Sequence, residues 1–163
     1  MQILVISDSH GRYESIPLLL DRYTGKVQTV VHLGDNAVDL LQFHSEYPAL
    51  TLVAVAGNCD FPGLAPTERI LTLGEPVPRR ILLIHGHIHN VKMNLDRLMY
   101  YAQEKEVDAC LFGHSHIPAV FSHGPILFMN PGSVSEPRGM SKAGYGLITI
   151  DGKGEITGEV INL

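Results

Sequence analysis

The sequence has no tryptophan and only two cysteines, Cys59 and Cys110, among its 163 residues. Two cysteines do not make a disulfide framework, which favours a reducing, cytoplasmic setting. No apolar run approaches the roughly 18 residues that a membrane span requires. The opening residues, MQILVISDSHGR, carry no basic region before their short apolar run. We therefore expect a first strand there and not a secretion signal.

Positive charge is also sparse, because 12 lysines and arginines face 17 aspartates and glutamates, giving a net charge of −5. The basic residues form no cluster. Proteins that grip nucleic acid through its phosphates usually carry a basic stripe, so we do not expect a nucleic-acid partner. The length and the hydrophobic share of 45% fit one domain spanning residues 1–163. The sequence leaves the oligomeric state open, a homo-oligomer included.

Apolar runs alternate with helical patterns in the first third of the chain, which predicts an α/β fold. Strands are expected at 2–7, 27–33 and 50–56, with helices at 13–22 and from 38 to just before Pro48. This order predicts right-handed crossovers and a parallel sheet. Further on, we expect a hairpin of 70–73 and 79–84, a helix at 91–105, and strands at 109–112, 119–123, 126–129, 145–150 and 155–161. These later strands suggest a second sheet packed on the first.

Five of the predicted strands run into a residue that can bind a cation. The candidates are Asp8, His10, Asp35, Asn58, His85, His114 and His116. Side chains at i and i+2 of an extended segment point to the same side, as Asp8 and His10 would. In open parallel sheets the functional site lies beyond the carboxyl ends of the strands. We therefore expect the candidates to converge at one edge.

Seven nitrogen and oxygen donors are too many for one tetrahedral zinc, which takes four. Two neighbouring divalent ions that share a bridging carboxylate would use them all. Such two-metal sites catalyse in-line displacement at phosphorus. A water bridging two dications would be hydroxide near neutral pH, so we expect hydroxide as the nucleophile.

The ordered motifs Asp8-x-His10, Gly34-Asp35, Gly57-Asn58, His85-Gly86-His87 and Gly113-His114-x-His116 resemble the calcineurin-like metallophosphoesterase superfamily. The short length and the 130–133 segment, NPGS, resemble its small bacterial and archaeal phosphodiesterase branch. The resemblance implies a four-layer αββα sandwich of two mixed sheets flanked by helices. It also implies a metal-dependent phosphodiesterase acting on a small phosphoester. A phosphomonoesterase, or a protein-interaction scaffold with this fold, is the alternative.

The same resemblance implies a division of the ligands. Asp8, His10 and His116 would hold one ion, Asn58, His85 and His114 the other, and Asp35 would bridge them. Manganese is frequent in the superfamily, while iron, zinc, nickel and cobalt suit the same donors. Asp35, Asn58, His85 and His87 form the expected catalytic set.

The sequence departs from the superfamily pattern at Cys59, which replaces a histidine that assists the leaving group. Val38 stands where the aspartate that orients this histidine would be. His87 is then the candidate acid, and Asp60 a candidate orienting residue. We interpret Cys59 as a wall residue near the second ion. Arg138 is a candidate for contact with substrate phosphate, with a solvated loop arginine as the alternative reading.

Four histidines lie outside these motifs. His32, His44 and His123 are expected to be ordinary strand or surface residues. His89 is a candidate for substrate contact, and a solvent-exposed side chain is the equal alternative. Arg12, next to His10, has the same two readings as Arg138, a contact with substrate phosphate or a solvated loop arginine.

Overall fold

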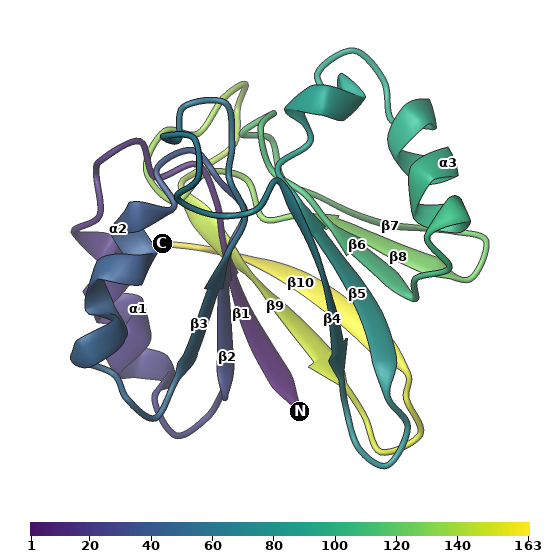
Figure 1. The fold of residues 1–163 in the computed structure, drawn as a ribbon, viewed down its shortest axis with the longest axis horizontal. Helices are drawn as coiled ribbons and strands as arrows, with labels where there is room; N and C mark the ends of the chain where they lie inside the picture. The colour runs from purple at the N-terminus through teal and green to yellow at the C-terminus, as the bar shows by residue number, and fades with distance from the viewer.

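The structure, a computed structural model of residues 1–163, contains two five-stranded sheets that face each other (Figure 1). The first sheet has the order β10-β9-β1-β2-β3 and the second the order β4-β5-β6-β8-β7. The strands are β1 (Gln2–Ile6), β2 (Thr29–His32), β3 (Thr51–Ala54), β4 (Glu68–Leu73), β5 (Arg79–Ile84), β6 (Ala109–Leu111), β7 (Ala119–His123), β8 (Ile126–Asn130), β9 (Gly144–Ile150) and β10 (Ile156–Asn162). The helices are α1 (Ser15–Tyr23), α2 (Val38–Leu41) and α3 (Asp96–Glu104), with 3-10 turns η1 (Gln42–Ser45) and η2 (His87–His89).

Both sheets are mixed. In the first, β1, β2 and β3 run parallel, while β9 is antiparallel to β1 and to β10. In the second, β5, β6 and β8 run parallel, with β4 and β7 antiparallel at the two edges. Helices or 3-10 turns lie between β1 and β2, β2 and β3, and β5 and β6, whereas β6 connects to β8 through the edge strand β7.

Three apolar clusters hold the four layers together. Ile3 and Val5 of β1 face the core between the sheets, whereas Leu4 and Ile6 face α1 and α2. A third cluster lies between the second sheet and α3 and includes the fully buried Leu98. Figure 1 shows α1 and α2 on the outer face of one sheet and α3 on the outer face of the other. The αββα sandwich expected from the sequence is confirmed.

The helix expected at 91–105 is shorter than its apolar pattern suggests, because α3 begins only at Asp96. Asn90 has a left-handed backbone (φ 54°), which breaks the helical path. The Asn94 side chain accepts a hydrogen bond from the Asp96 N–H at 3.2 Å, as a capping residue does. Met93, counted in the apolar stripe, is 84% exposed. None of the helices has the length and hydrophobicity that crossing a bilayer would take.

The loops that follow β1, β2, β3, β5 and β6 gather at one edge of the molecule, the upper edge in Figure 1. Backbone hydrogen bonds tie these loops to one another. The Asp8 N–H donates to the Gly34 carbonyl at 3.1 Å within the first sheet's edge. Within the second sheet's edge, the Gly113 N–H donates to the His85 carbonyl at 3.0 Å, and the His114 N–H joins the two edges by donating to Asp8 Oδ2 at 3.1 Å. The five predicted motifs therefore meet in space.

Candidate metal centre

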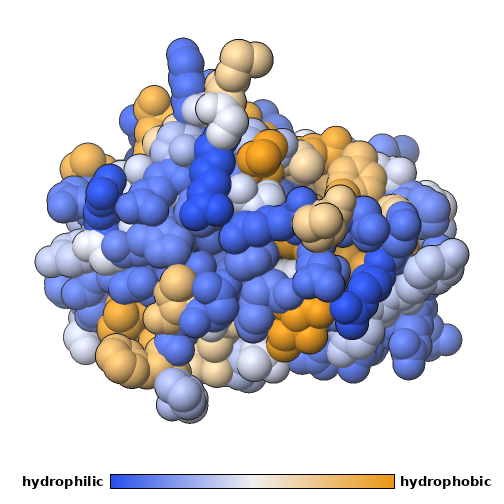
Figure 2. Space-filling view, turned by 90° about the horizontal axis from the view of Figure 1, so that it is seen from above, coloured by the Kyte–Doolittle hydropathy of each residue, from blue (hydrophilic) through white to orange (hydrophobic).

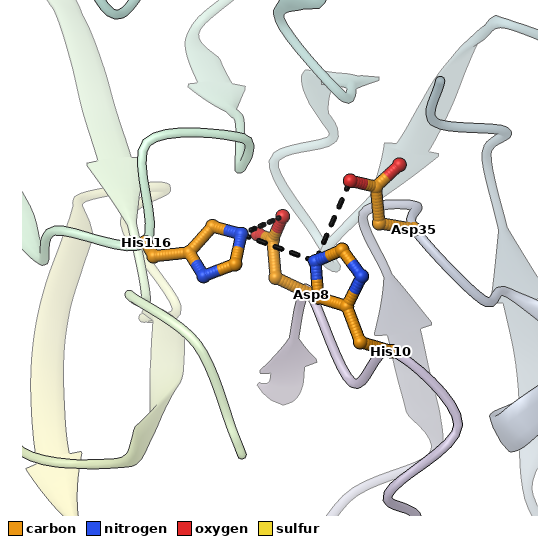
Figure 3. Close-up of side chains that lie close together, drawn as sticks. All are labelled: Asp8, His10, Asp35 and His116. Atoms are coloured by element: carbon orange, nitrogen blue, oxygen red, sulfur yellow. Dashed lines mark hydrogen bonds and ion pairs between the residues drawn. The ribbon is translucent and has the colours of Figure 1, made fainter. Parts of the chain in front are cut away.

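Four of the predicted ligands, Asp8, His10, Asp35 and His116, form one compact group whose side chains point toward each other (Figure 3). His116 Nε2 lies 3.2 Å from Asp8 Oδ1 and 3.2 Å from His10 Nε2. His10 Nε2 lies 3.6 Å from Asp35 Oδ2. One donor atom from each residue lies within 4.8 Å of every other, which is a spacing that a single cation can satisfy.

A second group shares Asp35 with the first and adds His85 and His114. His85 Nε2 lies 3.3 Å from Asp35 Oδ1 and 3.1 Å from His114 Nδ1. The two oxygens of the Asp35 carboxylate thus face different groups, Oδ2 the first and Oδ1 the second. This arrangement is what a carboxylate that bridges two cations requires.

The backbone is strained at these positions. Eight non-glycine residues have a positive φ. Five of these eight are predicted ligands, namely Asp8, His10, Asp35, His114 and His116. A left-handed conformation is unfavourable for residues with a side chain and collects at functional sites. The surrounding loops therefore hold these side chains in place at a cost that an ordinary turn would avoid.

Two glycines allow the loops to approach closely. A Cβ on Gly57 would lie 2.2 Å from Asp35 Oδ1, and a Cβ on Gly113 would lie 2.1 Å from Ser7 Oγ. Neither contact is sterically possible, so a side chain at either position would push the loops apart. The glycines in the Gly57-Asn58 and Gly113-His114 motifs are therefore packing requirements of the site.

Backbone carbonyls fix the tautomers of two histidines. His85 Nδ1 lies 2.7 Å from the Leu33 carbonyl, and His116 Nδ1 lies 2.6 Å from the Glu136 carbonyl. Because a carbonyl only accepts, each Nδ1 carries a proton and each neutral ring keeps a free lone pair on Nε2. Those Nε2 atoms are the ones that face the carboxylates. The same orientation of histidine by a hydrogen-bond acceptor is typical of metal ligands.

Asp8 Oδ1 is buried and has no hydrogen-bond partner. The other oxygen, Oδ2, accepts bonds from the Ser7 hydroxyl at 2.5 Å and the His114 N–H at 3.1 Å. Oδ1 instead faces Nε2 of His116 at 3.2 Å and Nε2 of His85 at 3.9 Å, and each of these nitrogens carries a lone pair when its ring is neutral. An acceptor surrounded by acceptors is unfavourable in a buried site. A bound cation would satisfy all of them, so the donor set fits a metal ion.

The electrostatics keep the carboxylates ionised. Burial alone would raise the pKa of Asp8, but the hydrogen bond with His116 and the charge of His85, which act when those rings are protonated, outweigh it and lower the pKa below its ordinary value. Asp35 behaves in the same way: burial would raise its pKa, but the hydrogen bond and the charge of His85 outweigh it, and the pKa lies well below its ordinary value. Burial and the neighbouring His85 lower the pKa of His114 to about 4, which keeps that ring neutral and able to bind a cation.

Asn58 and Cys59 follow β3 in an exposed turn next to the second group. The Asn58 amide donates to Cys59 Sγ at 3.3 Å, which leaves its carbonyl oxygen free as a ligand. The Cys59 N–H donates to Asp35 Oδ1 at 2.9 Å. Burial and the Asp35 charge raise the pKa of the Cys59 thiol, so it stays protonated. A protonated thiol is a poor nucleophile.

Asp60 joins two of the ligand loops. Its carboxylate accepts N–H bonds from Asp35 at 2.9 Å, from Ala37 at 2.7 Å and from Gly57 at 2.7 Å. The first two belong to the loop after β2 and the third to the turn after β3. Asp60 therefore fixes the distance between the Asp35 loop and the Asn58 turn.

The remaining sequence candidates lie around the two groups. The ring centroid of His87 is 5.4 Å from that of His85, and burial lowers the pKa of His87. His89 turns away and lies against Tyr101, with centroids 4.7 Å apart. Arg12 pairs with Glu136 at 3.4 Å. Arg138 is exposed, and its N–H donates to the His116 carbonyl at 3.3 Å.

A buried network that includes His32 supports the loop carrying Asp8 and His10. His32 Nδ1 accepts the Gly34 N–H at 3.2 Å, so Nε2 holds the proton and donates to Ser9 Oγ at 3.0 Å. The Ser9 hydroxyl donates in turn to Asp39 Oδ2 at 2.7 Å. His32 lies in strand β2 as expected, but it is fully buried and not at the surface. The position of His32 inside an apolar run could have indicated that it is buried, and a buried imidazole needs hydrogen-bond partners.

Comparisons with known proteins agree with this geometry. The sequence profile of the calcineurin-like phosphoesterase superfamily domain matches residues 1–153. The chain is 38% identical over 152 residues to the probable metallophosphoesterase YsnB of Bacillus subtilis, covering 93% of this chain and 85% of that protein. It is 30% identical over 174 residues to the phosphodiesterase YfcE of Escherichia coli, covering 93% and 89%. A solved structure of a predicted phosphoesterase from Streptococcus pneumoniae matches with a TM-score of 0.79 and 34% identity, over 98% and 96% of the two chains.

Proposed function

Because the chain belongs to the calcineurin-like phosphoesterase superfamily, we propose that it is a phosphodiesterase that holds two divalent metal ions and hydrolyses a small phosphodiester. Asp8, His10 and His116 would hold one ion, and Asn58, His85 and His114 the other. Asp35 would bridge the two. Manganese is the expected metal, and iron, zinc, nickel or cobalt suit the same donors.

The observation that carries the proposal is the buried Asp8 Oδ1, which has no hydrogen-bond partner and faces histidine nitrogens that can bind a cation when their rings are neutral. A pair of bound divalent ions supplies Lewis acidity toward a phosphoryl oxygen and generates a nucleophile from water near neutral pH. The chain itself contributes preorganisation. The Leu33 and Glu136 carbonyls orient the imidazoles of His85 and His116. The Asp60 carboxylate fixes the backbone of Asp35 by accepting its N–H.

The residues of the site are poorly suited to protonating the leaving group. Cys59 stands where an acid would help, and its pKa is raised, chiefly by burial. His87 remains the candidate acid, but burial lowers its pKa, so little of it is protonated at neutral pH. We therefore expect turnover to depend on good leaving groups, such as 4-nitrophenolate.

The test uses protein stripped of metal by a chelator and then supplied with Mn²⁺, with bis(4-nitrophenyl) phosphate as substrate. We expect hydrolysis to vanish on chelation and to return with Mn²⁺, and Asp8→Asn to bind less metal and stay inactive. Asp151→Asn, in the β9–β10 hairpin far from the site, is the matched control and should behave as the wild type. Full hydrolysis by the stripped protein would contradict the proposal.

The same assay separates the two alternatives. Higher kcat/KM for 4-nitrophenyl phosphate than for the diester would make the protein a phosphomonoesterase. Protein that binds Mn²⁺ but cleaves neither ester would favour the scaffold.

A further inference from the structure

A cavity of about 390 Å³ lies beside the candidate metal centre. Its lining includes Ser115 and Ile117, which alternate along the chain with His114 and His116. One segment therefore borders both the candidate metal centre and the cavity. Ligand pockets measure roughly 300–1,000 Å³, so this volume suits a small organic group and not a folded partner.

The wall of the cavity is mainly apolar. Leu95, Phe112, Ile117 and Ala119 contribute hydrophobic surface. Ser115 is the one uncharged polar residue of the lining, and its hydroxyl is already engaged, since it donates to the Ile117 carbonyl at 3.3 Å. A polar group would find no free uncharged partner here, whereas an aromatic or branched alkyl group would gain contact area.

The cavity is anchored to the core. Phe112 is 2% exposed and, with Leu95, packs in the cluster under α3. The Asn130 side-chain amide donates to the Gly113 carbonyl at 2.8 Å and to Ser115 Oγ at 3.0 Å. These contacts fix the segment between the two sites, so the cavity is ready to bind without rearrangement.

Two cationic side chains, Lys92 and Arg138, complete the lining, and both are exposed. Neither is in an ion pair, because the lysine and arginine pairs of this chain involve Arg12, Arg79 and Lys105 only. Unpaired positive charge beside an apolar cavity attracts an anion with an apolar substituent. Figure 2 looks onto this edge and shows groups of hydrophobic side chains among hydrophilic ones, several over the second sheet on the right.

From this juxtaposition we infer that the preferred substrates are phosphodiesters whose non-departing ester group is aromatic or branched and apolar. That group occupies the cavity, while Lys92 and Arg138 face the negative charge of the diester. The inference rests on the proposed function and names the substrate class of the same site.

The test compares phenyl 4-nitrophenyl phosphate with methyl 4-nitrophenyl phosphate, which share the leaving group and the reacting phosphorus. The readout is the ratio of their kcat/KM values in Mn²⁺-loaded protein. Ala119→Leu and Leu95→Phe fill the cavity from two separate segments of its lining, and each should lower the phenyl-to-methyl ratio roughly tenfold or more. The intrinsic reactivities of the two esters cancel when variant and wild type are compared.

Two further variants complete the design. Ala49→Leu, exposed in the turn before β3 at the opposite edge of the sheet, should leave the ratio at its wild-type value. Lys92→Gln should lower kcat/KM for both esters by a similar factor, and this loss should shrink at high salt.

The outcomes are distinguishable. An unchanged ratio in both filling variants, with melting temperatures near that of the wild type, would overturn the cavity assignment and leave the proposed function standing. Wild-type protein that hydrolyses neither ester after metal loading would overturn the proposed function, and this inference with it. A reduced ratio in both filling variants supports the substrate class.

Discussion

Replacing Asp60 with alanine should loosen the candidate metal centre without removing any of its predicted ligands. Three backbone N–H groups lose their charged acceptor, at distances of 2.7 to 2.9 Å in the wild type. Bonds to a charged group contribute about 1.5–3 kcal/mol each, and water replaces part of that at a half-buried site. We expect the free energy of unfolding to fall by about 2–4 kcal/mol, which lowers Tm by roughly 4–16 °C in a chain of this size.

Metal binding should fall as well, because Asp60 positions Asp35, the residue common to both groups. Losing a partner that orients a ligand typically costs about 10–100-fold in metal affinity. Calorimetric titration of the metal-stripped protein with Mn²⁺ measures this affinity, and thermal denaturation measures the change in Tm. Asp151→Ala is the control, because Asp151 accepts the Lys153 and Glu155 N–H groups at 2.8 Å each in a remote hairpin. The Asp151→Ala variant should have a lower Tm than the wild type and the same affinity for Mn²⁺. Wild-type Mn²⁺ affinity in Asp60→Ala would refute the reasoning.

Three further substitutions are informative. Asp35→Asn should weaken both metal sites and abolish turnover, and calorimetry showing two intact sites would contradict the bridging role. Cys59→Ala should retain measurable hydrolysis of bis(4-nitrophenyl) phosphate, since the thiol is protonated; an inactive variant with its metals bound would be inconsistent with that view. Burial lowers the pKa of His32 from 6.5 to about 4, so its contribution to stability is present above pH 6.5 and is lost as the pH falls to 4, by up to roughly 3 kcal/mol. Urea denaturation in chelator should therefore show a flatter pH dependence for His32→Gln.

Much of the fold was predictable because its central strands are buried on both faces and appear as apolar runs, whereas the partly exposed edge strand β7 was marked by the turn residues around it. The strands expected at 119–123, 126–129 and 145–150 match β7, β8 and β9 to within one residue. The start of α3 was not predictable from periodicity. Val91 and Leu95 continue the apolar pattern of the helix, but they pack on the core from a non-helical turn that Asn90 and Asn94 impose.

The convergence of Asp8, Asp35, His85 and His116 was predictable from topology, since parallel strands bring their carboxyl ends to one edge. Whether each side chain binds a metal remains a prediction. The supporting residues were harder to find. Hydrogen bonds from His32 to Ser9 depend on the register between β1 and β2, and no local pattern in the sequence encodes that register.

Each group of candidate ligands draws on both halves of the sandwich. Asp8, His10 and Asp35 follow strands of one sheet, while His85, His114 and His116 follow strands of the other. The separation between donors is therefore set by the thickness of the hydrocarbon layer between the sheets, where Ile81, Met129 and Ile148 meet. A methylene added or removed there would alter the distances between the candidate ligands, although these core side chains are not ligands themselves. The geometry of the candidate site therefore depends on core residues that belong to neither group of ligands.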